Sequence, residues 1–334
     1  MKTAIDMYCQ YLLSTQVNYT CTYFADHLEG LSHDSVHRFL RDEKLSPRLL
    51  WEKVSPLITQ SSHAFVIFDD TVLDKRHSQA ISMVRRQYSG NAHGVIKGIG
   101  VVNCLYLDPI NKQFWLVDFR VFDPQADGKT KLDHVLDMLR SLKARQVLFQ
   151  TVLMDSWYAA AELMKYLIKE GKTFYCPVKS NRKADGTSGQ EPYKPVDELK
   201  WSQQELARGK LVKLHKFPLD VKVKLFRVEV STHRTDYVVT NDTAQDAVQA
   251  VKEMCGLRWC VEQLHREEKQ LTGIELSQCR LARAQRNHIL AATLVWTRLR
   301  SLAYACGETA YQLKKGLLDQ YLCQQLMNPA VSYA

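Results

Sequence analysis

Residues 64–71 have the sequence AFVIFDDT, a short apolar run that ends in two aspartates and a threonine. Runs of this kind are typical of a buried strand, so we expect a strand whose carboxyl end carries Asp69 and Asp70. A second run, VLFQTVLM, ends at Asp155 in the same way. Considered singly, each aspartate is more simply explained as a cap of the turn or helix that follows it. Together, they are candidates for one shared site, because ligands of open α/β sheets bind beyond the strand carboxyl ends.

The order of the predicted elements indicates the fold. After the first strand, strand patterns at 101–107 and 113–122 flank the turn signal DPINK, which predicts a hairpin. A helical segment then leads to the strand before Asp155, and a further helix leads to a fifth strand, TFYCPV. The order β-β-β-α-β-α-β is that of the ribonuclease-H-like fold, in which the first and fourth strands are neighbours. We therefore expect an α/β protein with a mixed five-stranded sheet and flanking helices.

Other segments extend this core. Residues 1–62 show helical periodicity and are expected to form a small helical N-terminal domain, either a DNA-binding unit or a packing appendage. Residues 180–245 combine a Gly-, Pro- and Lys-rich segment with alternating strand patterns, which predicts a β-rich insertion. The core is then expected in two parts, 63–179 and 246–305, followed by a helical tail at 306–334.

Composition narrows the class of partner. The chain has 45 Lys and Arg against 36 Asp and Glu, a net charge of +9, which suits nucleic acid or an acidic membrane surface, although many basic proteins bind neither. Apolar runs are much shorter than a membrane span of about 18 residues, so we expect a soluble protein. Nine cysteines without a C-x-x-C pair argue against a disulfide framework and a zinc site, and they suit a reducing cytoplasm.

A third acid is expected on the helix predicted from GLRWCVEQLHREEKQLTG, residues 256–273. Glu267 and Glu268 point away from the face that carries Glu262, so helical geometry favours Glu262 as the partner of the two aspartates. The polar face consists of Arg258, Glu262, His265, Arg266 and Lys269. A separate apolar stripe that can pack on the sheet consists of Leu257, Val261, Leu264 and Leu271.

These segments resemble the DDE transposases of bacterial insertion sequences, in the group with a Tyr-x2-Arg-x3-Glu-x6-Lys motif. Arg258, Glu262 and Lys269 match three of the four motif positions, whereas Cys255 replaces the tyrosine and has no phenol for a DNA phosphate. FDDT at 68–71 resembles the first-acid motif, and MDSWY at 154–158 resembles the second. The resemblance covers nearly the whole chain, including the β insertion, and assigns catalysis and metal binding to Asp69, Asp155 and Glu262.

The resemblance also implies a cofactor and partners. Two Mg²⁺ ions, for which Mn²⁺ substitutes, would activate the attacking oxygen and stabilise the leaving oxygen, and carboxylates are their natural ligands. The expected partners are double-stranded DNA, as transposon ends and target, and a second copy of the chain in a homodimer on DNA. The expected location is the bacterial cytoplasm, on the nucleoid, with no membrane association. Whether a DNA hairpin forms is left open by Cys255.

Further residues are predicted to contact DNA. A basic cluster around RRQYSG is explained either as a hydrated loop or as a loop that leaves the first catalytic strand and meets phosphate. Trp201, in the β insertion, is either a packing residue or a platform for a displaced base. The complete predicted set is Arg258, Lys269, His265, Arg266, Lys75, Arg85, Arg86 and Trp201.

Two other functions use the same residues. A nuclease of the same fold would cut DNA without joining it, and the three acids do not distinguish the two activities. A DNA-binding protein derived from a transposase would keep the shape and charge without turnover, but that role gives no reason to keep Asp69, Asp155 and Glu262 together.

Overall fold

The computed structural model describes residues 3–218, 220–232 and 234–331. Its core strands are β1 (Phe65–Asp74), β3 (Gly94–Leu107), β4 (Phe114–Phe122), β5 (Thr151–Met154) and β6 (Thr173–Val178). They lie in the order β4-β3-β1-β5-β6. β1, β5 and β6 pair in parallel, whereas β3 is antiparallel to both β1 and β4. This mixed sheet is the ribonuclease-H-like core that the element order predicts, with β3 and β4 as the predicted hairpin.

β1 continues beyond the aspartates at which the sequence predicts its end. Its antiparallel pairing with β3 extends from Phe65, opposite Leu107, to Asp74, opposite Gly98. Its parallel pairing with β5 stops earlier, at Phe68 opposite Met154. Asp69 and Asp70 therefore lie inside a long strand, but at the point where its parallel neighbour ends.

The basic segment RRQYSG is a strand and not the loop that we expected. β2 (Arg85–Ser89) pairs with the first part of β3, from Arg85 opposite Gly98 to Ser89 opposite Gly94. Gly98 also pairs with β1 on its other side, where a Cβ atom would lie 2.5 Å from the Leu73 carbonyl oxygen, so the close approach of β3 to β1 requires glycine there. β2 and β4 thus share the same side of β3, one after the other.

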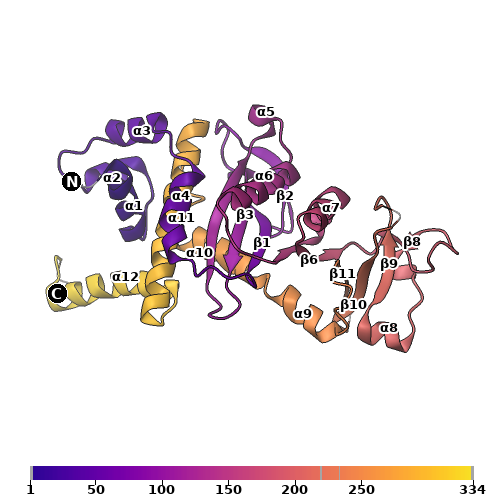
Figure 1. The fold of residues 1–334 in the computed structure, drawn as a ribbon. Helices are drawn as coiled ribbons and strands as arrows, with labels where there is room; N and C mark the ends of the chain where they lie inside the picture. The colour runs from indigo at the N-terminus through magenta and orange to yellow at the C-terminus, as the bar shows by residue number, and fades with distance from the viewer. Residues whose placement is uncertain (1–2, 219, 233, 332–334) are drawn as a thin grey trace.

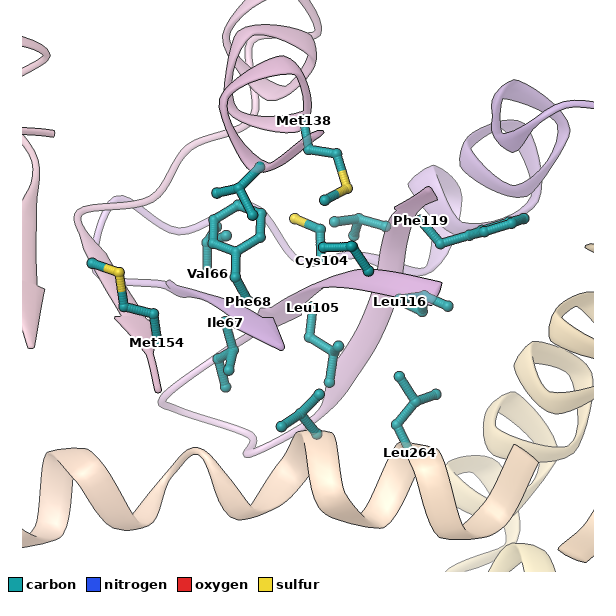
Figure 2. Close-up of a cluster of buried hydrophobic side chains, with 14 of the residues drawn as sticks. Val66, Ile67, Phe68, Cys104, Leu105, Leu116, Phe119, Met138, Met154 and Leu264 are labelled. Carbon is teal, nitrogen blue, oxygen red and sulfur yellow. The ribbon is translucent and has the colours of Figure 1, made fainter. Parts of the chain in front are cut away.

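Helices cover both faces of the sheet. Figure 2 shows Met138 of α6 beside Phe68 and Cys104 on one face, and Leu264 of α10 beneath Ile67 and Leu105 on the other. The alternation along β1 thus assigns its residues to an α6 face and an α10 face. The core helices are α6 (Lys131–Ala144), α7 (Ala161–Lys169), α10 (Trp259–Leu271) and α11 (Ala282–Cys306), with the short α5 (Pro124–Asp127) and η2 (Ser156–Tyr158).

The insertion extends the same sheet, because β11 pairs with β6 and continues through β10 and β9 to β7 and β8. Figure 1 shows this part at one end of an elongated molecule. Its elements are β7 (Lys183–Asp185), β8 (Lys194–Pro195), η3 (Val196–Glu198), α8 (Gln203–Arg208), β9 (Lys210–Leu214), β10 (Val223–Ser231) and β11 (Arg234–Thr240). α9 (Val248–Gly256) leads back to the core.

The other end of the molecule is helical, with the N-terminal helices grouped beside α11 and with α12 projecting from the body (Figure 1). Asn287 of α11 fixes this group, since its amide nitrogen donates to the carbonyl oxygens of Leu40 and Glu43 at 2.9 and 2.8 Å. No helix in the described ranges is both long and apolar enough to span a membrane. The elements are α1 (Ala4–Ser14), α2 (Cys21–Asp26), α3 (His33–Asp42), α4 (Pro47–Val54), η1 (Ser55–Leu57) and α12 (Ala310–Met327).

Candidate active site

Asp69 and Asp155 are brought side by side by strand register. Phe68 and Met154 are paired on the adjacent parallel strands β1 and β5, and each aspartate is the next residue. The backbone of Asp155 is still extended, so both side chains leave the sheet on the same face, the one covered by α10. The charge of Asp155 acts on Asp69 and contributes to raising its pKa. The two predicted strand acids therefore lie next to each other on one face of the sheet.

Asp70 lies on the opposite face, and its carboxylate has two partners within the protein. Its carboxylate forms an ion pair with Lys131 Nζ at 2.5 Å and accepts a hydrogen bond from the Tyr158 hydroxyl at 2.7 Å. Lys131 is the first residue of α6, and Tyr158 belongs to η2, the short helix after β5. Asp70 therefore joins elements of the core and is not presented beside Asp155.

α10 brings the third acid to the Asp69 face. Arg258, which precedes the first turn of α10, donates from Nη1 to Asp69 Oδ2 at 2.9 Å. Glu262 is four residues further along, hence one helical turn away on the same face. His265 follows on this face and lies 3.0 Å from the side chain of Asn103, which is the β3 residue paired with Asp69. Glu262 is thus bracketed by two residues that contact Asp69 or its strand partner.

The neighbouring glutamates of α10 are buried in a different environment. Glu267 accepts hydrogen bonds from Trp296 Nε1 at 2.8 Å and from Arg300 Nη1 at 3.0 Å, both on α11. Glu268 accepts one from the Thr293 hydroxyl at 3.0 Å, and burial raises its pKa to about 8. Glu262, in contrast, is exposed and has no hydrogen-bond partner within the part of the chain that the structure describes.

The electrostatics of Asp69 suit a cation site. Burial raises the pKa of Asp69 to about 7 against the opposing effect of Arg258, and the nearby charge of Asp155 raises it further. Asp155 Oδ1 accepts hydrogen bonds from the backbone nitrogens of Trp157 and Tyr158 at 2.8 and 3.3 Å, which fixes its orientation. The carboxylates offer only oxygen ligands, the type that hard divalent cations prefer. The residues therefore fit a divalent metal, which would offset the concentrated negative charge.

The three acids do not close into one tight cluster. Among the residues that the structure describes, oxygen atoms of Asp69, Asp155 and Glu262 do not all lie within 4.8 Å of one another. Arg258 occupies one oxygen of Asp69. The fold thus places the acids around one end of the sheet, and Asp69 forms an ion pair with Arg258.

A family model for the transposase DDE domain matches residues 60–298. The chain belongs to the DDE transposase family. It is therefore a DNA transposase, an enzyme that cleaves DNA with the help of divalent metal ions. No protein with a curated description matches the chain.

Solved structures of low sequence identity align with between about half and nearly all of the chain. The piggyBac transposase synaptic complex with hairpin DNA is 13% identical, with a TM-score of 0.46, over 98% of this chain and 72% of that chain. Endonuclease V of Ciona intestinalis in complex with DNA is 12% identical, with a TM-score of 0.35, over 67% and 96%. The Mos1 mariner paired end complex with Mn is 14% identical, with a TM-score of 0.21, over 52% and 58%.

Two residues of the transposase that we expected to contact DNA are buried instead. Lys75 is only 4% exposed, and its Nζ donates to the carbonyl oxygens of Glu275 and Ser277 at 2.5 and 2.6 Å. His265 is held against Asn103, and burial lowers its pKa to about 3, so the ring is neutral. The sequence did not predict this burial, because position on a helix face or in a basic run does not reveal what packs over a side chain.

The other residues that we predicted to contact DNA differ in how exposed their side chains are. Lys269 is largely buried and donates from Nζ to the Val72 carbonyl at 2.9 Å, which fixes α10 to β1. Arg86 on β2 and Arg266 on α10 are exposed, and Arg266 lies over the exposed ring of Trp259. Arg85 is half-buried over the Phe122 ring. Trp201 is half-buried against the core, as the packing alternative requires.

Several residues of the site were not predicted. Lys131 and Asn103 hold Asp70 and His265, but nothing in their local sequence distinguishes them from other helix or strand residues. Trp157, next to Asp155, is 51% exposed and is part of the MDSWY motif, so the sequence carried a signal for it. Arg182, from the loop after β6, donates to the Ala159 carbonyl at 3.5 Å, and its Nε and Nη2 have no partner among the described residues.

Proposed function

We propose that Asp69, Asp155 and Glu262 hold two Mg²⁺ ions, for which Mn²⁺ substitutes, and that this site hydrolyses DNA and transfers strands at the ends of an insertion sequence. One observation carries the assignment. The pairing of Phe68 with Met154 is followed on each strand by an aspartate, on the face where Arg258 fixes the start of α10. The contacts of Asp70 with Lys131 and Tyr158 support the choice of Asp69 over Asp70.

The bound ions would supply the activated attacking oxygen and the stabilised leaving oxygen of phosphodiester chemistry. The protein's own residues prepare this site. Arg258 neutralises Asp69, and it is placed to bind the DNA phosphate once metal ions take over that task. Arg182, with two unpartnered nitrogens in the described structure and a contact to the Ala159 carbonyl after η2, is a second candidate for phosphate.

We assign the duplex, as transposon end and target, to the exposed basic side chains around the site. Arg86 and Arg266 lie on elements that join β3 or contact Asp69. The helical N-terminal region, residues 1–62, is the candidate for recognition of the ends, because α3 exposes Arg38 and Arg41. We propose that two chains act together as a homodimer on DNA. Mass measurement of the assembled complex by light scattering tests this, and one chain per bound end with no pairing of ends would contradict it.

The assignment of the acids is tested by cleavage of a DNA end with Mg²⁺ or Mn²⁺. Asp69→Ala, Asp155→Ala and Glu262→Ala are each expected to reduce cleavage by at least about a thousandfold while end binding remains largely intact, since each removes a metal ligand. Asp70→Asn is the matched control for the adjacent position. Full activity of any alanine variant, or severe loss in Asp70→Asn with tolerance at Asp69, would contradict the proposal.

Joining is tested separately with pre-cleaved ends. A transposase is expected to transfer these ends into target DNA, with the same dependence on the three acids. Cleavage of intact ends without any joining of pre-cleaved ones would instead favour a nuclease.

A further inference from the structure

Two cysteines and a histidine from distant parts of the chain meet at the base of the N-terminal helices. One ligand atom each from Cys21, His37 and Cys279 lies within 4.8 Å of both others. Cys21 begins α2, His37 lies in the middle of α3, and Cys279 belongs to the segment between α10 and α11. The cysteines are free thiols in the structure. This cluster contains none of the residues of the transposase site.

The cluster has the chemistry of a zinc site. Thiolate and imidazole are the ligands that Zn²⁺ prefers, at about 2.3 Å from sulfur and about 2.0 Å from nitrogen. In a tetrahedral site these bonds separate the ligand atoms by about 3.3 to 3.8 Å. The observed separations, all below 4.8 Å, require only a small closure of the side chains.

The backbone around each ligand is already fixed, so little order has to be gained on binding. Gln285 donates from Nε2 to the carbonyl oxygens of Cys279 and Ser277, at 2.7 and 3.1 Å. The Tyr11 hydroxyl donates to the Thr20 carbonyl, next to Cys21, at 2.9 Å. α3, which carries His37, is held on α11 through Asn287. A preorganised set of this kind favours metal binding over separate, mobile thiols.

We propose that Cys21, His37 and Cys279 bind one Zn²⁺ ion that ties the N-terminal helices to the catalytic core. The fourth position faces an open cavity of about 590 Å³ that His37 and Cys279 line together with Asp34, so Asp34 or solvent completes the coordination. The absence of a C-x-x-C pair argued against zinc, but these ligands come from three separate segments and form no local spacing.

The ion would fix the position of the N-terminal helices relative to the catalytic core of the transposase. The same cavity is lined by Arg38 and Arg41 of α3 and by Arg280, the residue after Cys279. A bond from His37 to the metal and from the metal to Cys279 fixes the basic face of α3 relative to the segment that follows α10. The spacing between the N-terminal basic surface and the three acids is then set by a crosslink and not by packing alone.

The test uses Co²⁺ as the probe on the full-length chain, purified under reducing conditions and stripped of metal. Tetrahedral thiolate coordination gives Co²⁺ a sulfur-to-metal charge-transfer band, which the carboxylates of the active site cannot produce. We expect this band to saturate with one ion per chain and to bleach when Zn²⁺ displaces Co²⁺. Elemental analysis of the protein as first purified is expected to show bound zinc.

Variants localise the band. Cys21→Ser and Cys279→Ser are expected to lose it, whereas Cys306→Ser, at an exposed free cysteine, keeps it unchanged. His37→Ala removes an exposed side chain, so the fold is retained, and is expected to weaken Co²⁺ binding at least tenfold, since loss of an outer-shell partner alone costs about tenfold or more.

Three results would overturn the proposal. The first is a wild-type protein without a charge-transfer band, and the second is an unchanged Co²⁺ affinity in His37→Ala. The third is a disulfide between Cys21 and Cys279, found by mass spectrometry in protein isolated from the reducing cytoplasm. Because the cleavage assay does not enter this test, failure here leaves the assignment of the three acids standing.

Discussion

Asp69 and Asp70 are adjacent in the chain and opposite in environment. Burial raises the pKa of Asp69 to about 7 despite its ion pair with Arg258. Asp70 is held by Lys131 and by the Tyr158 hydroxyl, two partners that suit its ionised form. Ionisation of Asp69 therefore costs the fold free energy, whereas the contacts of Asp70 stabilise it.

This difference predicts opposite effects on stability. Asp69 has a folded pKa of about 7 against an ordinary value of 3.8, so the folded protein binds a proton more tightly and its stability falls as pH rises between those values. At about pH 8 without metal, Asp69→Asn should therefore raise the free energy of unfolding by up to about 4 kcal/mol. Thermal unfolding with a chelator measures this, and the gain should vanish near about pH 4, where Asp69 is already protonated.

Asp70→Asn is the control for the same measurement. It leaves Lys131 without its ion-pair partner, so we expect a loss of about 1 to 3 kcal/mol at the higher pH. Stabilisation by Asp70→Asn, or destabilisation by Asp69→Asn, would show that the environments of the two acids have been assigned the wrong way round.

At the scale of an element, α10 presents two kinds of acid. Its inner side packs on the sheet through Val261 and Leu264 and bonds to α11 through Glu267. Its other side carries Arg258 and Glu262 towards the end of the sheet. The helix is therefore anchored by Glu267, while Glu262 is left exposed, as the proposed metal ligand must be.

Stability and activity are expected to separate along this helix. Glu267→Ala leaves the buried Arg300 guanidinium unpaired, so chemical denaturation should show a loss of about 3 to 5 kcal/mol. Glu262→Ala, at an exposed position, should change the free energy of unfolding by less than about 0.5 kcal/mol while cleavage is lost. Large destabilisation by Glu262→Ala would indicate a structural role for that residue.

Two basic residues that follow β1 also differ in exposure: Arg86 is exposed and Lys75 is buried. Arg86→Ala on β2 should weaken DNA binding for all sequences and reduce the slope of log affinity against log salt by about 1. Lys75→Ala should leave this slope unchanged and lower stability, because two carbonyl oxygens lose their donor. A changed salt slope in Lys75→Ala would contradict the buried position of its side chain.

At the scale of the whole molecule, the catalytic core lies between the N-terminal helices and the β insertion (Figure 1). The chain carries a net charge of +9, and cations are exposed on α3, β2 and α10. These exposed cations are the side chains that we propose to contact the duplex.

Contact with phosphates along this length predicts a steep dependence on salt. Each neutralised phosphate contributes about −0.9 to the slope of log affinity against log salt concentration, because counterions are released from the duplex. Titration of a fluorescent DNA end at several salt concentrations should therefore give a slope of about −5 or steeper. An affinity that is insensitive to salt would remove the argument from charge.

Local sequence was sufficient for the order of strands and helices, because periodicity and turn residues act over a few positions. Asp69, Asp155 and Glu262 could be selected in this way, from two apolar runs that end in acids and from one helical face. The helix stripe of Val261 and Leu264 also follows from spacing alone, and the structure confirms that both are buried.

Tertiary structure alone decided what each polar group meets. Lys75 and His265 have the local sequence of exposed residues, yet a distant segment and β3 cover them. Asp69 and Asp70 differ in role because the alternation of β1 turns them to opposite faces, and RRQYSG is a strand because β3 supplies its partner. Long-range contacts fix burial and pairing, and these quantities cannot be read from neighbours along the chain.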